Sequence, residues 1–485
     1  MGNMQQLDQR TRTSESEAPG SRGEAQYRPG ATITDWQPED EAFWLAKGRR
    51  VAARNLWISV PALLLGFVVW QVWSVTVVNL GAVGFPFSAS QLFWLTAVPG
   101  ITGGTLRIVY TFAMPLVGGR RWTALSTAVL VLPLLWLGFA VQDTGTPYWV
   151  MLLIAALCGM GGANFASSMV NIGFFYPKRL KGNALGVNGG LGNLGVSVVQ
   201  LVAPLVVTAG VLLAPAGGAQ TKQPGGGQVW LQNGAFLWVP LLLVTAGLAW
   251  FSMNDLKSSA APFRRQRIIF RRRQTWLMTW LYVGTFGSFI GFAAALPLLI
   301  KTTFTPIDPA YSATTYAWLG PLCGALTRWA GGWLADRVGG ARCTLISFAG
   351  MAVSIGAVIA FLPSGGSDGN FWGFLIAFLC AFSFSGLGNG STFQQIPVIF
   401  RNQHLRSARG QGAAAEAAAL KQAEMEAGAV TGFSSAIAAY GFFFIPAMFA
   451  NLAVTSALWS FVAFYVTCLA ITWYCYARKR AADPC

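Results

Sequence analysis

Two arginines stand out because each lies inside a long apolar segment. Arg107 lies about sixteen residues into the apolar segment 91–114, and Arg328 lies within the apolar segment 312–333. A charge at membrane depth costs about 3 kcal/mol even on lenient scales, so such a residue normally has a partner or a function. A structural ion pair would need a carboxylate, and no Asp or Glu lies inside the apolar segments identified below. We therefore expect the two guanidinium groups to bind an anion.

The surrounding residue types indicate what kind of anion this is. Arginine stays charged and presents a planar fork of donors that suits oxyanions. The neighbours available in the apolar segments are aromatic and neutral, among them Phe165, Tyr282 and Phe286. A small flat monoanion can lie between aromatic faces and accept hydrogen bonds in its own plane. Phosphate or an organic dianion would need more donors.

The composition excludes a soluble protein. The 485 residues are 54% hydrophobic and 10% charged, whereas soluble domains carry roughly 25% charged residues. The net charge of +16 would suggest nucleic acid in a soluble chain. Here the charge lies in the loops between apolar segments, where it sets topology and meets anionic lipids. The seven cysteines form no closely spaced metal-binding set, and we expect neither a cofactor nor an enzymatic site.

Apolar segments of membrane-spanning length recur along the whole chain. We place twelve spans near 56–80, 91–114, 122–141, 147–175, 186–212, 229–252, 275–300, 312–333, 343–362, 371–399, 428–450 and 453–476. From Lys47 onward, the connecting loops and flanks on one side hold 25 Lys and Arg, and those on the other side hold two. This asymmetry places both termini in the cytoplasm, which agrees with an even number of spans. We expect a multi-pass protein of the bacterial inner membrane.

The twelve spans divide into two similar halves. Arg107 is followed ten residues later by VGG at 117–119, and Arg328 is followed ten residues later by VGG at 338–340. Paired six-span halves indicate an all-α membrane protein with the major facilitator fold, whose site lies between the halves. The predicted parts are a disordered cytosolic tail (1–50), a first half (51–254), a basic linker (255–274), a second half (275–480) and a short tail (481–485).

The loop after the second span of each half should contribute to conformational change. The segment 332–342 resembles the loop signature of the major facilitator superfamily and includes Asp336 and Arg337. The matching segment 114–121 has no Asp, so we expect an acidic contact in the second half only. Glycines of the fourth and fifth spans, such as Gly161, Gly190 and Gly192, should let helices approach closely and rock.

Several motifs resemble one family closely. Residues 161–177 read GGANFASSMVNIGFFYP and residues 386–394 read GLGNGSTFQ. They resemble the two signatures of the nitrate/nitrite porter family. Residues 33–40 (ITDWQPED) and 54–59 (RNLWIS) resemble the NarK-type exchangers in particular. The resemblance covers about residues 33–478. It leaves out the first thirty residues and the Ala-rich segment 412–427.

The resemblance implies a role for each matching residue. Arg107 and Arg328 match the family's pair of substrate-clamping arginines. Phe165 and Phe286 match the aromatic residues that sandwich the anion. Tyr282 and Asn193 match side chains that hydrogen-bond it. The motif residues that approach the anion are Gly162, Gly388 and Ser391. The implied partners are nitrate, nitrite, membrane lipids and a pathway of cytoplasmic nitrate reduction.

The absence of a titratable relay favours exchange over proton coupling. Proton-coupled transporters usually carry a buried Asp, Glu or His, but the sole histidine, His404, is expected in a cytoplasmic loop. Nitrate/nitrite antiport is thus the main hypothesis. The alternatives are a nitrate/proton symporter of the same family, an exchanger for phosphate or organophosphates, and an anion sensor that does not transport.

Overall fold

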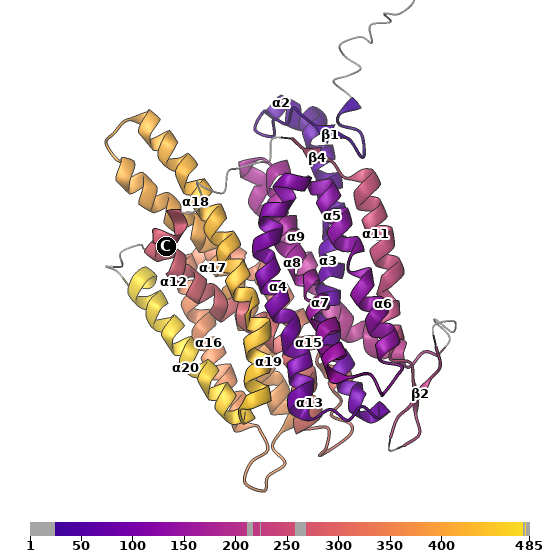
Figure 1. Cartoon of the computed structure of the whole chain (residues 1–485). Coiled ribbons are helices and arrows are strands. Elements are labelled where there is room, and N and C mark those ends of the chain that lie inside the picture. The colour runs from indigo at the N-terminus through magenta and orange to yellow at the C-terminus, as the bar shows by residue number, and fades with distance from the viewer. Residues whose placement is uncertain (1–24, 211–216, 224, 258–267, 479–480, 482–485) are drawn as a thin grey trace, which may run out of the picture.

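The helices of the chain form two side-by-side groups that correspond to the two halves (Figure 1). The computed structural model describes residues 25–210, 217–223, 225–257, 268–478 and 481. The first half comprises β1 (Thr32–Ile33), α2 (Glu41–Phe43), η1 (Trp44–Gly48), α3 (Arg49–Leu80), η2 (Gly81–Val83), α4 (Ala89–Val117), α5 (Gly119–Ala128), α6 (Val131–Ala140), α7 (Tyr148–Cys158), α8 (Met160–Phe175), α9 (Lys178–Val207), β2 (Gln220–Thr221), β3 (Gln228–Val229), α10 (Asn233–Phe236), α11 (Trp238–Ser252) and β4 (Asp255–Leu256). The second half comprises α12 (Arg273–Tyr282), η5 (Val283–Gly287), α13 (Ser288–Thr303), α14 (Ala313–Tyr316), α15 (Leu319–Val338), α16 (Gly340–Ala360), α17 (Phe371–Ala408), α18 (Ala413–Ala439), α19 (Gly441–Asn451), α20 (Val454–Thr472) and η6 (Trp473–Ala477).

The described residues contain eleven helical stretches that are long and apolar enough to cross a membrane. The remaining predicted span, the eighth at 312–333, corresponds to α14 and α15. This stretch is less apolar because α15 carries Arg328, Asp336 and Arg337. With α15 included, the helices agree with the twelve predicted spans. Several helices, such as α9 and α17, extend well beyond the predicted boundaries.

The repeated VGG sequence forms the same turn in both halves. Gly118 ends α4 with φ +101°, and Gly339 ends α15 with φ +94°. A residue with a Cβ is strained at these angles, so glycine is required where one span turns sharply into the next. The sequence echo therefore marks equivalent turns of the two halves.

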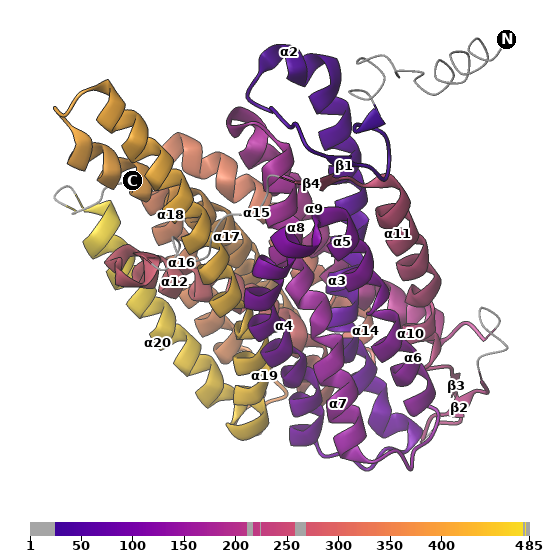
Figure 2. The same ribbon diagram turned by 45° about the horizontal axis from the view of Figure 1, so that its top comes forward.

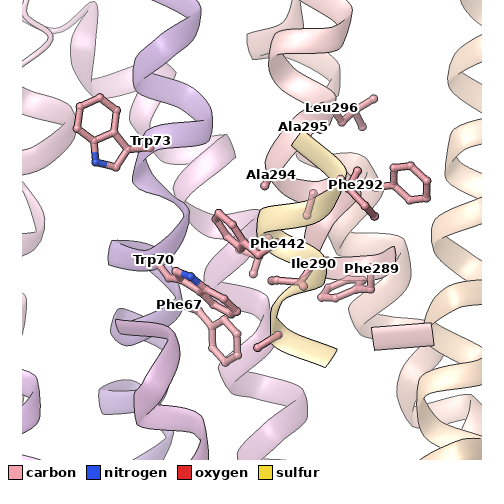
Figure 3. Close-up of a cluster of buried hydrophobic side chains, with 14 of the residues drawn as sticks. Phe67, Trp70, Trp73, Phe289, Ile290, Phe292, Ala294, Ala295, Leu296 and Phe442 are labelled. Carbon is pink, nitrogen blue, oxygen red and sulfur yellow. The ribbon is translucent and has the colours of Figure 1, made fainter. Parts of the chain in front are cut away.

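The halves pack closely against each other at one end of the bundle. Here α4 packs on α19, α3 on α13 and α9 on α15. The Trp70 ring of the first half stacks on Phe442 of the second, with centroids 4.6 Å apart, in an apolar cluster between the halves (Figure 3). A Cβ on Gly100 of α4 would lie 2.4 Å from the backbone nitrogen of Phe443, so a side chain there would push the halves apart.

The N-terminal tail is folded over much of its length, unlike the prediction of a disordered segment 1–50. Residues 1–24 lie outside the described part, but β1 pairs in parallel with β4, and α2 and η1 follow. Ile33 and Trp44 are 1% and 3% exposed and belong to a cluster that includes Phe175. Apolar burial against the end of α8 therefore stabilises this segment, which caps one end of the first half (Figure 2).

We expected an acidic contact at the loop of the second half only, but the first half has one as well. In the first half, Asp255 of β4 supplies the acid that the segment 114–121 lacks. Its carboxylate accepts from the Arg120 backbone N–H at 2.8 Å and from the Arg120 Nε at 3.2 Å, and it lies 3.6 Å from the Arg121 Nε. In the second half, Asp336 accepts from the Gln394 side chain at 2.9 Å. A distant part of the chain thus replaces the missing local acid.

We predict that Asp255→Ala lowers the thermal unfolding midpoint of the detergent-purified protein much more than Asp336→Ala. The Asp255 side chain is 7% exposed, and its loss removes hydrogen bonds to a charged group worth about 2–3 kcal/mol. Asp336 is exposed, and surface substitutions usually change stability by about 0.5 kcal/mol or less. Equal shifts in the two variants would contradict the role assigned to Asp255.

Candidate functional site

Arg107 lies at the centre of the bundle on α4 and is 0% exposed. Its Nε donates to the Gly162 carbonyl at 3.0 Å. Its Nη1 donates to the backbone oxygen and to the hydroxyl of Ser435, both at 2.9 Å. The remaining nitrogen, Nη2, is buried without a hydrogen-bond partner. The guanidinium is therefore held from both halves and keeps one free donor.

Arg328 approaches the same place from α15 of the second half. Its guanidinium carbon lies 5.9 Å from the centroids of the Phe286 and Phe393 rings, and that of Arg107 lies 5.2 Å from the Phe286 ring. Like Arg107, it has a buried nitrogen, Nη1, with no hydrogen-bond partner. Among the described residues, the ion pairs include neither arginine. Two uncompensated cations thus flank one aromatic ring.

The predicted aromatic pair faces across the two halves. Phe165 of α8 and Phe286 of η5 are 2% and 0% exposed, and their ring centroids are 6.3 Å apart at an angle of 25°. Tyr282 stacks on Phe286 from the other side, at 5.7 Å and 14°. The Arg107 guanidinium carbon lies 4.9 Å from the Phe165 ring and 5.2 Å from Trp70, so cation–π attraction supports its charge.

Two predicted hydrogen-bonding side chains also have unused capacity. The Tyr282 hydroxyl and both polar atoms of the Asn193 amide are buried and have no hydrogen-bond partner. Buried polar atoms are rarely left unsatisfied, and each specific exception requires a reason. Four of the predicted substrate ligands, the two arginines included, share this property. A ligand bound beside Phe286, which Arg107, Arg328 and Tyr282 all approach, accounts for three of them at once.

The three remaining motif residues make packing contacts in this conformation. A Cβ on Gly162 would lie 2.5 Å from the Trp70 ring, so glycine allows its carbonyl to reach Arg107. A Cβ on Gly388 would lie 2.6 Å from Thr285. The Ser391 hydroxyl lies 2.7 Å from that of Thr344 on α16. The contacts of Gly388 and Ser391 therefore hold α17 against its neighbours.

The predicted gating glycines divide into two kinds. A Cβ on Gly161 would lie 2.2 Å from the Gly66 carbonyl oxygen, and one on Gly192 would lie 2.6 Å from Leu63, so both permit close contact with α3. Gly190 differs, because no atom lies within 4 Å of the position of its Cβ. Of the loop residues, Arg337 stacks on Trp333 at 3.9 Å, and Asp336 contacts α17 as described above.

Gly190 belongs to a strip of glycines on α9, and α18 of the other half carries a similar strip. On α9, Gly182, Gly186 and Gly190 follow one another at intervals of four residues, and open space surrounds each missing Cβ. On α18, Gly428 and Gly432 have the same spacing and the same open space. Residues four apart share one face of a helix. These faces lead to Asn193 and Ser435, the first a predicted ligand and the second the partner of Arg107.

An ion pair joins the far ends of these two strips. Lys178, four residues before Gly182, lies 2.8 Å from the carboxylate of Glu424, four residues before Gly428. Both side chains are more than half exposed, so this ion pair is weak and easily broken. Beyond Asn193 on α9, the Ser197 hydroxyl donates to the Trp318 carbonyl at 2.9 Å, where the two halves pack closely.

The eleventh predicted span, 428–450, belongs to a longer helix that also carries a buried acid, Glu426. The Ala-rich segment is helical, and α18 with α19 forms one spanning stretch, Ala413–Asn451. Glu426 is 1% exposed and accepts from the Arg272 Nε and Nη2 at 2.9 and 3.0 Å. His404, which lies in α17 rather than in a loop, places its Nε2 3.3 Å from the same carboxylate. Glu426 lies nine residues from Ser435, or roughly 14 Å along the helix.

A cavity on the second half lies away from these residues. It measures about 780 Å³ and lies between α16 and α17, where apolar side chains such as Ile346, Val353 and Ile376 line it. These three side chains are more than half exposed. The cavity therefore belongs to the outer surface of the second half and is not the anion site.

Comparison with known proteins confirms the family expected from the motifs. The sequence model of the Major Facilitator Superfamily matches residues 62–419. The chain is 48% identical over 453 residues to the nitrate/nitrite transporter NarU of Salmonella typhimurium, covering 92% of this chain and 96% of NarU. It shows the same identity and coverage with NarU of Escherichia coli K12. It is 43% identical over 468 residues to the probable nitrate/nitrite antiporter NarK2 of Thermus thermophilus, covering 94% and 99% of the two chains. The chain therefore belongs to the Major Facilitator Superfamily and, within it, to the family of the NarU and NarK2 transporters.

Proposed function

We propose that this protein exchanges nitrate for nitrite across the bacterial inner membrane, with the anion held between Arg107 and Arg328. The observation that carries the proposal is the set of unused donors at the centre of the bundle. Arg107 Nη2, Arg328 Nη1, the Tyr282 hydroxyl and the Asn193 amide are buried and unpartnered. Nitrate and nitrite are planar monoanions that accept hydrogen bonds in their own plane. The names of the relatives agree with these substrates.

The aromatic pair suits a flat ligand. Two rings on either side of a planar anion would be roughly 7 Å apart, twice the contact distance of about 3.5 Å. The Phe165 and Phe286 centroids are 6.3 Å apart, so the two rings need to separate only slightly to admit the anion. A tetrahedral phosphate is thicker and carries more charge. The geometry therefore supports nitrate and nitrite over phosphate.

The charge of the site supports exchange. An empty site holds two cations in a buried place, and their repulsion opposes further approach of the halves. A monoanion lowers the local charge from +2 to +1 and bridges the two arginines. Nitrate and nitrite both neutralise the site in this way. The protein can therefore carry one anion in, change conformation and carry the other out, as alternating access requires.

The two glycine strips provide the route for the anion. They lead from Asn193 and Ser435 to Lys178 and Glu424, at the end of the molecule where the basic residues predict the cytoplasm. The opposite end is closed by the packing of α4 on α19. Because the Lys178–Glu424 ion pair still joins the two strips at that end, we propose that it breaks when the anion passes to or from the cytoplasm, the side on which both termini are expected. Exchange of this kind would serve nitrate reduction in the cytoplasm.

Glu426 and His404 favour one competing hypothesis, a nitrate/proton symporter. Glu426 is buried and the His404 Nε2 lies 3.3 Å from its carboxylate, and buried acids and histidines are the usual proton relays of transporters. However, Arg272 holds Glu426 through two hydrogen bonds, and Gln422 donates to the same carboxylate at 2.8 Å. Glu426, His404 and Gln422 belong to the second half, and Arg272 lies in the linker directly before α12. This arrangement supports a structural ion cluster over a proton relay to the anion site.

The proposal predicts the outcome of uptake into proteoliposomes. Labelled nitrate should enter vesicles that contain nitrite, and an inward proton gradient alone should not drive uptake into vesicles without a substrate anion. The reason is that the anion site contains arginine, asparagine and aromatic side chains and no group with an ordinary pKa between about 6 and 8. Robust uptake driven by the proton gradient alone would refute exchange and favour the symporter.

Each arginine should resist even conservative replacement. Arg107→Lys and Arg328→Lys keep the charge but lose the planar fork of donors. Because a hydrogen bond to a charged group is worth about 1.5–3 kcal/mol, nitrate binding should weaken roughly 10- to 100-fold and exchange should fall accordingly. Arg50→Lys, at an exposed position, is the matched control. Normal exchange by either clamp variant, in protein that elutes as a single species, would disprove the clamp.

A further inference from the structure

A second basic site lies far from the anion site, where three elements of the second half meet. A pocket of about 380 Å³ lies between the start of α12, the end of α17 and the residues of η6 and after it. Its lining is dominated by four arginines and contains no carboxylate: Arg271, Arg272, Arg273, Gln274, Leu277, Gln403, Tyr474, Cys475 and Arg478. Its volume falls within the range of ordinary ligand sites.

Three of these arginines keep their charge available. Arg272 is neutralised by Glu426, as described above. In the described part of the chain, Arg271, Arg273 and Arg478 take part in none of the ion pairs. Arg478 stacks on Tyr474 at 3.9 Å, and its Nε is buried without a hydrogen-bond partner. The pocket therefore holds about three uncompensated positive charges.

The start of α12 adds to this field. Arg273 is its first residue, and the helical stretch continues to Thr303. The free N–H groups and the dipole at a helix N-terminus attract anions, phosphate groups above all. Arginine side chains and a helix N-terminus thus act on the same small volume.

Exposed aromatic residues lie on the same elements as the residues that line the pocket. Trp276, Trp473 and Tyr474 are 54%, 57% and 53% exposed, and Trp280, one turn beyond Trp276, is 45% exposed. In a membrane-spanning protein, such Trp and Tyr residues mark the boundary between the hydrocarbon and the headgroups. The pocket therefore opens at headgroup level, and the aromatic surface continues from it toward the hydrocarbon.

We propose that this pocket binds the phosphate headgroup of an anionic phospholipid, with the acyl chains along Trp276 and Trp280. Basic pockets at the ends of membrane helices are suited to such headgroups. The pocket is too large for a nitrate-sized anion, and a free phosphate would make no use of the apolar surface beside it. The assignment to the cytoplasmic leaflet rests on the proposed orientation, whereas the binding itself does not. A bound lipid would hold the ends of α12, α17 and η6 to the membrane while the halves move.

The test measures lipid binding and does not involve transport. Purified protein is titrated with phosphatidylglycerol or phosphatidylcholine in detergent, and bound lipid is counted by native mass spectrometry. We expect the triple variant Arg271→Gln/Arg273→Gln/Arg478→Gln to bind phosphatidylglycerol about a hundredfold more weakly than the wild type. Each basic side chain near a membrane surface contributes roughly a factor of five to the affinity for anionic lipid. The single variant Arg273→Gln should lose about fivefold by the same reasoning, and its substitution is at an exposed side chain.

The matched control is Arg49→Gln/Arg50→Gln/Arg409→Gln, which removes the same charge from exposed positions outside the pocket. It should bind phosphatidylglycerol as the wild type does, and phosphatidylcholine should bind weakly to all forms. An equal loss in both triple variants would show diffuse charge attraction and overturn the site, as would unchanged binding by the pocket variants. In the last experiment, inorganic phosphate is added to the protein with its bound lipid. If it displaces the lipid fully at millimolar concentration, the pocket is a phosphate site and the lipid assignment is wrong.

Discussion

The unneutralised pair of guanidinium groups at the centre of the bundle is the constraint on which the rest of the structure depends. Removing a charge from water is expensive, and attraction to a partner repays the cost only when the geometry is good. Arg107 is fully buried, yet its described contacts are neutral: the Gly162 carbonyl, Ser435 and three aromatic rings. These contacts hold the charge in place without cancelling it. An anion is the partner that the site lacks.

Several cations at the ends of the bundle are paired with acids. Arg120 meets Asp255, Arg272 meets Glu426 and Lys178 meets Glu424. The centre therefore differs from the ends, and the difference has a mechanical consequence. Because each half contributes one arginine, a mobile anion can join the halves and then leave. A carboxylate fixed in either half would neutralise one arginine permanently, and the halves would no longer need a transported anion to come together.

Local patterns made part of this structure predictable from the sequence. Apolar length gave the spans, and the spacing of Arg107 and Arg328 from the two VGG turns gave the halves. Family resemblance, rather than periodicity, selected Phe165, Tyr282 and Asn193 among many aromatic and polar residues. The contacts of Ser435 and Asp255 were missed because they join residues 328 and 135 positions apart. Glu426 was missed because the Ala-rich start of α18 is less apolar than the rest of that span, although it is part of the same buried helix.

The account's central claim is that a bound anion draws the two arginine-bearing halves together, and a distance measurement tests it most directly. Spin labels are placed at the exposed positions Asn183 on α9 and Lys421 on α18, on opposite sides of the glycine strips. The label-to-label distance is then measured by electron double resonance with and without nitrate. Nitrate should shift the distribution to shorter distances in the wild type and leave the Arg107→Lys/Arg328→Lys variant unchanged. The same distribution in the wild type with and without nitrate, or an equal shift in the variant, would contradict the account.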